Sequence, residues 1–133
     1  MYKILIADGE RALRLLIAGT LEIGEYDILE ADNGIQALDL VKRERPDLII
    51  LDVMMPGMTG YEVCKRIKTN PDIADTKVLI LTAKGQQSDK EAAWEALADF
   101  YLAKPFSPMD LLSMVEEILS RKVNGNARLN VYQ

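Results

Sequence analysis

The sequence predicts an α/β protein built on a doubly wound, five-stranded parallel sheet. Short apolar runs alternate with amphipathic helical stretches five times along the chain. Strands that are joined through helices pair in parallel, and right-handed crossovers then place helices on both faces of the sheet. The length of 133 residues fits one domain with a short tail.

Each predicted strand is a short, mainly apolar run. The runs cover residues 4–7, 26–31, 48–51, 78–81 and 100–103. The second run is the most polar, so we expect it near an edge. The strand order 2-1-3-4-5, one of two common doubly wound arrangements, places it there.

Five helices are predicted between and after these strands. Their marker residues are Leu13, Leu16, Ile17 and Leu21; Ile35, Leu38 and Val41; Tyr61, Cys64, Ile67 and Lys68; Ala92, Ala93, Ala96 and Leu97; and Leu111, Leu112, Val115, Ile118 and Leu119. The last helix has the clearest start signal, with Ser107 as N-cap, Pro108 at the first helical position and Asp110 three residues after the cap.

Composition excludes several kinds of site. The chain has no histidine and one cysteine, Cys64, so imidazole catalysis, a zinc site and an internal disulfide are ruled out. The net charge of -5 argues against nonspecific nucleic-acid binding by this segment. No apolar stretch reaches membrane-spanning length, and the N-terminus is not a signal peptide, so we expect a soluble, cytoplasmic setting.

Four of the five runs end in a polar residue that can do chemistry. Asp8 follows the first run, Asp52 the third, Thr82 the fourth and Lys104 the fifth. In the predicted strand order these four strands are neighbours, and their carboxyl ends meet at the edge where open α/β sheets bind ligands. Two carboxylates, a hydroxyl and an ammonium group indicate a site for a divalent cation and a phosphoryl group.

Together these segments resemble a response-regulator receiver domain, the phosphoacceptor module of two-component signalling. The matching stretches are ILIADGE, PDLIILDVMMPGMTGYEVCKRIK, VLILTA and YLAKPF. The resemblance covers residues 3–121 and implies a flavodoxin-like fold. We therefore expect a receiver domain at 1–122 and, because it lacks a core pattern, a linker or disordered tail at 123–133.

The resemblance also implies a role for each strand-end residue. Asp52 is expected to accept the phosphoryl group, giving an acyl phosphate. Lys104 and Thr82 are expected to bind phosphate oxygens, and the backbone of Ala83 to contribute beside Thr82. Tyr101 matches the aromatic residue that swings inward as Thr82 moves toward the phosphate.

A Mg²⁺ ion is implied at the same site. Its expected ligands are Asp8, Asp52 and the backbone carbonyl of Met54. Pro105 matches the position of a cis peptide in the family.

Gly9 is the main departure from the family pattern. Members usually carry two adjacent acidic residues after the first strand, and the second, a direct metal ligand, is Gly9 in this chain. Glu10 is expected to point into the first helix and not to compensate. Asp8 shifting into direct coordination and a water filling the gap are two ways in which the site could adapt.

A second departure lies before and in the fifth strand. Leu97 stands where the family has a glycine that ends the fourth helix in a left-handed conformation, and Phe100 replaces a polar residue. Both enlarge the apolar surface of helix 4, strand 5 and helix 5. The sequence leaves open whether they form an exposed patch or tuck inward.

The resemblance further implies a partner and an output. The partner would be a histidine kinase or phosphotransfer protein, and an output domain or a homodimer would form through helix 4, strand 5 and helix 5. The protein would be no enzyme beyond its own phosphoryl transfer and hydrolysis. Met54 and Lys84 flank the acyl phosphate without an acidic group, so we expect a persistent phosphoryl state.

Two alternatives remain beside this interpretation. One is a degenerate receiver that binds partners without phosphorylation, because of Gly9. The other is an enzyme of a different doubly wound family, but the sequence lacks both G-x-G-x-x-G and G-x-x-x-x-G-K-[ST]. A hydrolase with an aspartyl-phosphate would need a second carboxylate where Met54 stands.

Overall fold

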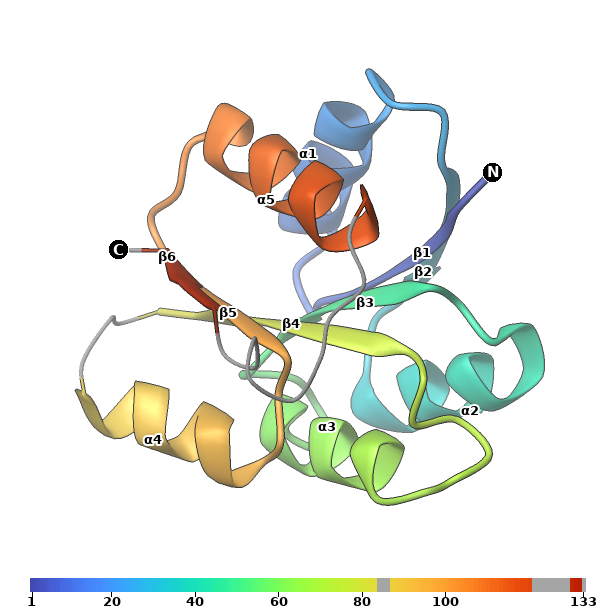
Figure 1. The fold of residues 1–133 in the computed structure, drawn as a ribbon, viewed down its shortest axis with the longest axis vertical. Helices are drawn as coiled ribbons and strands as arrows, with labels where there is room; N and C mark the ends of the chain where they lie inside the picture. The colour runs from blue at the N-terminus through green and yellow to red at the C-terminus, as the bar shows by residue number, and fades with distance from the viewer. Residues whose placement is uncertain (84–86, 121–129, 133) are drawn as a thin grey trace.

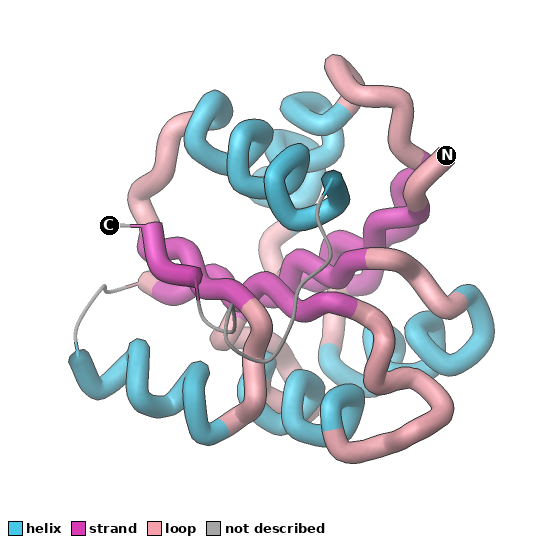
Figure 2. Tube along the Cα trace, in the orientation of Figure 1, coloured by secondary structure: helices cyan, strands magenta, loops and turns pink. Residues whose placement is uncertain are grey.

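The computed structural model describes residues 1–83, 87–120 and 130–132. The strands are β1 (Lys3–Ala7), β2 (Asp27–Ala31), β3 (Leu48–Asp52), β4 (Lys77–Thr82), β5 (Phe100–Ala103) and β6 (Asn130–Tyr132). The helices are α1 (Arg11–Leu21), α2 (Gly34–Glu44), α3 (Gly60–Lys68), α4 (Gln87–Glu95) and α5 (Pro108–Ser120). The strands form one layer between two layers of helices (Figure 2). α1 and α5 lie on one face, and α2, α3 and α4 lie on the other (Figure 1).

The sheet is entirely parallel, with the order β2-β1-β3-β4-β5-β6. The predicted order of the first five strands is confirmed. The sixth strand was not predicted, because the tail was expected to add no element. β6 pairs with the outer edge of β5, with Phe100 opposite Asn130. Such pairing uses backbone groups that any edge strand offers, so a side-chain pattern does not reveal it.

Alternation along the strands divides the core into two clusters. In β1, Ile4 and Ile6 pack with the residues of α1 and α5, whereas Leu5 and Ala7 pack with those of α2 and α3. The same alternation in β3 and β4 buries both faces of the sheet. The central strands are therefore fixed on both sides, and the residues at their ends have defined positions.

The helix predictions hold best for α5. All five of its predicted core residues are buried. The backbone N–H of Asp110 donates to Ser107 Oγ at 3.0 Å, and the N–H of Ser107 donates to Asp110 Oδ2 at 3.3 Å, which forms a reciprocal cap. Within the described ranges, no helix has the length and apolar character needed to cross a membrane.

Two apolar residues predicted on buried helix faces are exposed. Leu16 of α1 is 54% exposed and Ile35 of α2 is 64% exposed. In α1 the buried residues are Ile17 and Leu21, with Leu13 partly buried, so its buried stripe has a spacing of four residues and is narrower than predicted. Leu16 lies beside this stripe.

Leu97 ends α4 in the left-handed conformation, with φ at 68°. Its N–H donates to the Trp94 carbonyl and the N–H of Ala98 donates to the Ala93 carbonyl, both at 3.0 Å. This pair of bonds is a Schellman motif, in which glycine is the usual residue at the left-handed position. Phe100 is buried at 1% exposure, so it does not form an exposed patch.

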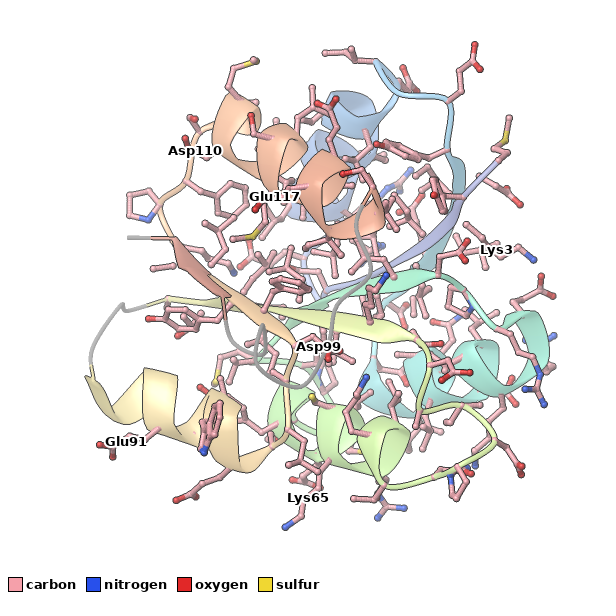
Figure 3. The ribbon with its side chains drawn as sticks, in the orientation of Figure 1. Lys3, Lys65, Glu91, Asp99, Asp110 and Glu117 are labelled. Carbon is pink, nitrogen blue, oxygen red and sulfur yellow. The ribbon has the colours of Figure 1, made fainter. Side chains whose placement is uncertain are left out.

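An ion pair at the amino edge of the sheet was not predicted. Lys68 Nζ of α3 lies 2.9 Å from Asp99 Oδ2, just before β5. Asp99 points into the protein, whereas Lys65, which lies on α3 like Lys68, points toward solvent (Figure 3). The pair ties the end of α3 to the start of β5.

Candidate functional site at the carboxyl edge of the sheet

The predicted polar residues meet at the carboxyl edge. Asp8 directly follows β1, Asp52 ends β3, Thr82 ends β4 and Lys104 directly follows β5. Asp8, Asp52 and Thr82 are buried. A cavity of about 270 Å³ opens at this edge, and its lining residues are Glu10, Asp52, Val53, Met54, Thr82, Ala83 and Lys104.

Asp52 and Lys104 form an ion pair within this cavity. Lys104 Nζ donates to Asp52 Oδ1 at 2.8 Å. The backbone N–H of Lys104 donates to the carbonyl of Thr82 at 2.7 Å, which places the lysine beside β4. The peptide bond between Lys104 and Pro105 is cis, as the resemblance implied. The arrangement puts a buried carboxylate, an ammonium group and the threonine together.

The backbone of Asp52 is held by the start of α3. The N–H of Gly60 donates to the carbonyl of Val53 at 2.9 Å. A Cβ atom at residue 60 would collide with the Asp52 carbonyl oxygen, so the close approach requires glycine. Thr59 caps the helix by accepting from the N–H of Glu62 at 3.2 Å.

Asp8 is the most constrained carboxylate of the site, at 1% exposure. Its Oδ1 accepts from the N–H of Glu10 at 2.8 Å, while its buried Oδ2 has no hydrogen-bond partner among the described residues. Burial raises the pKa of Asp8, and the hydrogen bond from Glu10 opposes this. The negative charge of Asp52 raises the pKa further, while Lys104 lowers it. The negative charge of an ionised Asp8 is therefore only partly neutralised by its neighbours, and a bound cation would supply the missing positive charge.

Arg14 supports the backbone beside Asp8, a role that the sequence did not reveal. Its Nη1 donates to the Asp8 carbonyl at 2.8 Å, and its Nε pairs with Glu30 at 3.3 Å. The arginine spans from α1 to β2 and holds the turn after β1. Its position one turn into α1 gave no sequence signal for this contact.

The residues present fit a magnesium ion. Mg²⁺ is commonly bound by one or two carboxylates and keeps several waters. Asp8 offers an unpartnered buried oxygen, and Asp52 lies in its electrostatic neighbourhood. No three acidic side chains in the described part of the chain form a cluster that could hold the ion alone. The protein would thus supply few ligands and leave the others to water.

Gly9 leaves space where the family's second acidic residue would stand. A Cβ atom there would lie 3.2 Å from Pro56 Cδ and 3.8 Å from the Met54 carbonyl oxygen. A carboxylate at residue 9 would therefore extend beside the carbonyl that was predicted to bind the metal. The glycine removes one acidic group from the edge of the cavity without distorting it.

Glu10, which was predicted to point into the first helix, lies at the start of that helix. Glu10 is the N-cap residue of α1, but its side chain makes no capping hydrogen bond. It lines the cavity together with Asp52 and Lys104. Helical periodicity does not apply at an N-cap, because the cap residue has an extended backbone, so the sequence pattern does not determine the direction of its side chain.

The predicted switch pair is buried. Thr82 is 3% exposed, and Tyr101 in β5 is 2% exposed and packs in the core between the sheet and α2 and α3. Lys84, which was expected to influence hydrolysis, lies outside the described residues. Met54 lines the cavity, while its side chain is largely exposed.

Comparison with known sequences supports the assignment made from this geometry. The model of the response regulator receiver domain family matches residues 4–116. The phosphate regulon transcriptional regulatory protein PhoB of Pseudomonas aeruginosa is 40% identical over 124 residues, which are 93% of this chain and 54% of that protein. The response regulator MprA of Mycobacterium leprae is 40% identical over 129 residues, which are 97% of this chain and 56% of that protein. The chain spans about half the length of these curated relatives.

Solved structures give the same result. The chemotaxis response regulator CheY4 of Vibrio cholerae superposes with a TM-score of 0.83 at 32% identity, covering 89% of this chain and 98% of that one. The receiver domain of the Francisella response regulator 1452 gives a TM-score of 0.84 at 30% identity, covering 91% and 98%. The chain belongs to the response regulator receiver domain family of two-component systems.

Proposed function

We propose that this receiver accepts a phosphoryl group on Asp52 from a phosphohistidine of a histidine kinase or phosphotransfer protein. The observation that supports the proposal most is the Asp52–Lys104 pair at 2.8 Å, within a cavity that Thr82 also lines. A cytoplasmic location accords with such a donor.

The transfer is a displacement at phosphorus. An Asp52 oxygen forms a bond to phosphorus, the bond to the donor's imidazole nitrogen breaks, and its electron pair stays on that nitrogen. Lys104 would leave Asp52 and pair with phosphate oxygens, while the Thr82 hydroxyl and the Ala83 backbone N–H would donate to them. Mg²⁺, held by Asp8, Asp52 and the Met54 carbonyl, would neutralise charge on the phosphoryl oxygens. The protein would catalyse no reaction beyond this transfer and the hydrolysis of its own acyl phosphate.

Phosphorylation would act on the surface formed by α4, β5 and α5. Thr82 ends β4 and Tyr101, which is already buried, lies in the neighbouring β5, so movement of Thr82 toward the phosphate would change the packing around the tyrosine. Both side chains are buried, and a shift of either one repacks the core beneath this surface. β6 lies along the outer edge of β5, so a partner or a second copy would meet that strand there.

Intact-mass spectrometry tests the acceptor. The full chain is incubated with acetyl phosphate and Mg²⁺ beside Asp52→Ala and a control, Asp75→Ala, which removes an exposed carboxylate. A single phosphoryl adduct should form on the wild type and the control and be absent from Asp52→Ala. The adduct should decay over minutes or longer, because Met54 supplies no acidic group to activate water; a half-life of seconds contradicts that expectation.

A degenerate receiver is the second candidate, and Gly9 is the observation that favours it. No adduct on a folded protein at high Mg²⁺ concentration would support this alternative. Adduct formation by Gly9→Asp but not by the wild type would then assign the loss to that one residue. A Cβ atom at residue 9 would lie 3.2 Å from Pro56 Cδ, so this substitution requires a small shift of the proline.

A further inference from the structure

Glu10 lies at the edge of the cavity with its carboxylate uncommitted. It is exposed, makes no capping hydrogen bond, and forms no ion pair among the described residues. The nearby Arg14 is occupied by Glu30 and the Asp8 carbonyl. Nothing described in the protein holds the Glu10 side chain away from the site.

The site lacks the family's second carboxylate, because Gly9 stands at that position, and Glu10 could supply the missing negative charge. The Asp8 Oδ2 atom is buried without a partner, and the electrostatic neighbours of this carboxylate include Asp52, Lys104 and Glu10. Gly9 itself brings no acid, and a Cβ atom at that residue would lie 3.8 Å from the Met54 carbonyl oxygen and 3.2 Å from Pro56 Cδ. Asp8, with its unpartnered buried oxygen, is adjacent to residue 9 in the chain, and the Met54 carbonyl lies close to that residue, where the family's second carboxylate would stand.

Direct coordination by Glu10 does not fit the geometry. The acidic side chains of the described residues do not converge in threes at metal-binding distance. A glutamate at the edge of the cavity can instead accept a hydrogen bond from a metal-bound water, and such contacts typically change metal affinity by roughly 10–100-fold.

We propose that Glu10 compensates for Gly9 by binding a water ligand of Mg²⁺ and so supplies the acidic charge that the glycine lacks. This inference rests on the proposed function, because it assumes a metal at the phosphorylation site. When ionised, the carboxylates of Asp8, Asp52 and Glu10 together with the ammonium group of Lys104 would match the charge of a divalent cation. In a receiver with an acid at residue 9, a glutamate at residue 10 would be dispensable for metal binding.

A double-mutant cycle on the full chain tests the compensation. Mg²⁺ alone is titrated against wild type, Glu10→Gln, Gly9→Asp and the double variant, and the dissociation constant is read from amide resonance shifts in NMR spectra. Glu22→Gln serves as the matched control, because it removes the same charge from the other end of α1. Urea unfolding verifies that each variant is folded.

Glu10→Gln should weaken Mg²⁺ binding about tenfold in the wild-type background, and Gly9→Asp should strengthen it at least about tenfold. With Asp at residue 9, the loss caused by Glu10→Gln should shrink to about threefold or less, since the direct ligand is restored. Glu22→Gln should leave the affinity within about twofold, because an exposed charge so distant is screened.

Two results overturn the inference while leaving the proposed function intact. In the first, Glu10→Gln behaves like Glu22→Gln although the wild type binds Mg²⁺ and is phosphorylated. In the second, Glu10→Gln causes the same loss in both backgrounds, so that it acts independently of residue 9. If neither wild type nor Gly9→Asp binds Mg²⁺, the metal site and the proposed function fail together.

Discussion

The two edges of the sheet each carry a partly buried lysine–aspartate pair, and the two pairs are built differently. At the amino edge, Lys68 lies 2.9 Å from Asp99; at the carboxyl edge, Lys104 lies 2.8 Å from Asp52. The residue types and distances are nearly the same. What separates them is how completely the remaining polar atoms are satisfied.

The amino-edge pair is fully engaged. Lys68 Nζ also donates to the carbonyls of Ala74 at 2.8 Å and Thr76 at 3.1 Å. Asp99 Oδ2 also accepts from the backbone N–H of Val78 at 2.8 Å. All three ammonium protons have an acceptor, so Lys68 has no donor left for a ligand, which favours a structural role for the pair.

The carboxyl-edge pair has unused capacity. In the described part of the chain, Lys104 Nζ donates to Asp52 alone, and the nearby Asp8 Oδ2 has no partner. A buried polar group without a partner costs about 1–3 kcal/mol of stability. Such a cost is typical of sites whose missing partner is a ligand. This cost distinguishes the Asp52–Lys104 pair, which we propose to be reactive, from the Lys68–Asp99 pair.

Exchange of either lysine for methionine should distinguish most strongly between the structural role of Lys68 and the proposed phosphate-binding role of Lys104. Lys104→Met should slow phosphorylation by acetyl phosphate by about 100–1000-fold, because the cation that neutralises phosphate oxygens is lost. Its free energy of unfolding should fall less than that of Lys68→Met, because one hydrogen bond of the ammonium group is lost instead of three. Lys68→Met should show the reverse. Equal effects of the two substitutions on both the mass-spectrometric rate and urea unfolding would refute the distinction.

Removal of the amino-edge carboxylate should give the largest loss of stability. Asp99→Ala leaves the partly buried Lys68 ammonium without its counter-charge and the Val78 N–H without an acceptor. The free energy of unfolding should fall by about 3 kcal/mol. Asp39→Ala, which removes an exposed pair with Arg43, is the control and should change little. A loss for Asp99→Ala no larger than for this control would show that the amino-edge pair is dispensable.

Asp8 makes the carboxyl edge sensitive to pH in the absence of divalent cations. Its pKa is raised in the folded protein, so the folded state binds more protons than the unfolded state between the two pKa values. Stability should therefore fall as the pH rises through this window. Asp8→Asn should remove this decline and raise the free energy of unfolding at pH 7 by about 1 kcal/mol. Urea unfolding in EDTA between pH 4 and 7 would measure both; parallel curves for variant and wild type would rule out the assignment.

Leu97, near the amino edge, is strained by its left-handed backbone, and its substitution should give the smallest effect. Leu97→Gly relieves the left-handed conformation but loses the contacts of a half-buried side chain. Leu97→Ala loses the same contacts and keeps the strain. The glycine variant should therefore be more stable than the alanine variant by about 1 kcal/mol in thermal or urea unfolding. An alanine variant that is equally stable would mean that φ at 68° imposes no cost.

The parts of the molecule that could be predicted from sequence are those in which a side-chain pattern carries the information. The apolar runs predicted the first five strands and were consistent with the observed strand order. The polar residues that follow or end these runs predicted that Asp52, Thr82 and Lys104 meet at the carboxyl edge. Ser107 gave the cap of α5. In each case the determining residues are adjacent or repeat at a fixed interval, so local chemistry is enough.

The parts that were missed depend on backbone partners or on residues far apart in the sequence. β6 pairs with β5 through the main chain. Lys68 and Asp99 are 31 positions apart, and nothing in the pattern of either helix or strand links them. The place of Glu10 at the edge of the cavity follows from its position as the N-cap residue of α1. These three features could be found only from the structure, because no residue type or sequence interval indicates them.

The contact between Gly60 and Asp52 has a consequence for how this family member can evolve. No side chain is tolerated where the first residue of α3 meets the carbonyl of Asp52. A mutation at Gly60 would therefore displace Asp52, the proposed phosphoacceptor, although residue 60 does not line the cavity. The exposed face of α3 can therefore change in sequence and acquire new binding partners. Its first residue must remain glycine, because it contacts the backbone of Asp52.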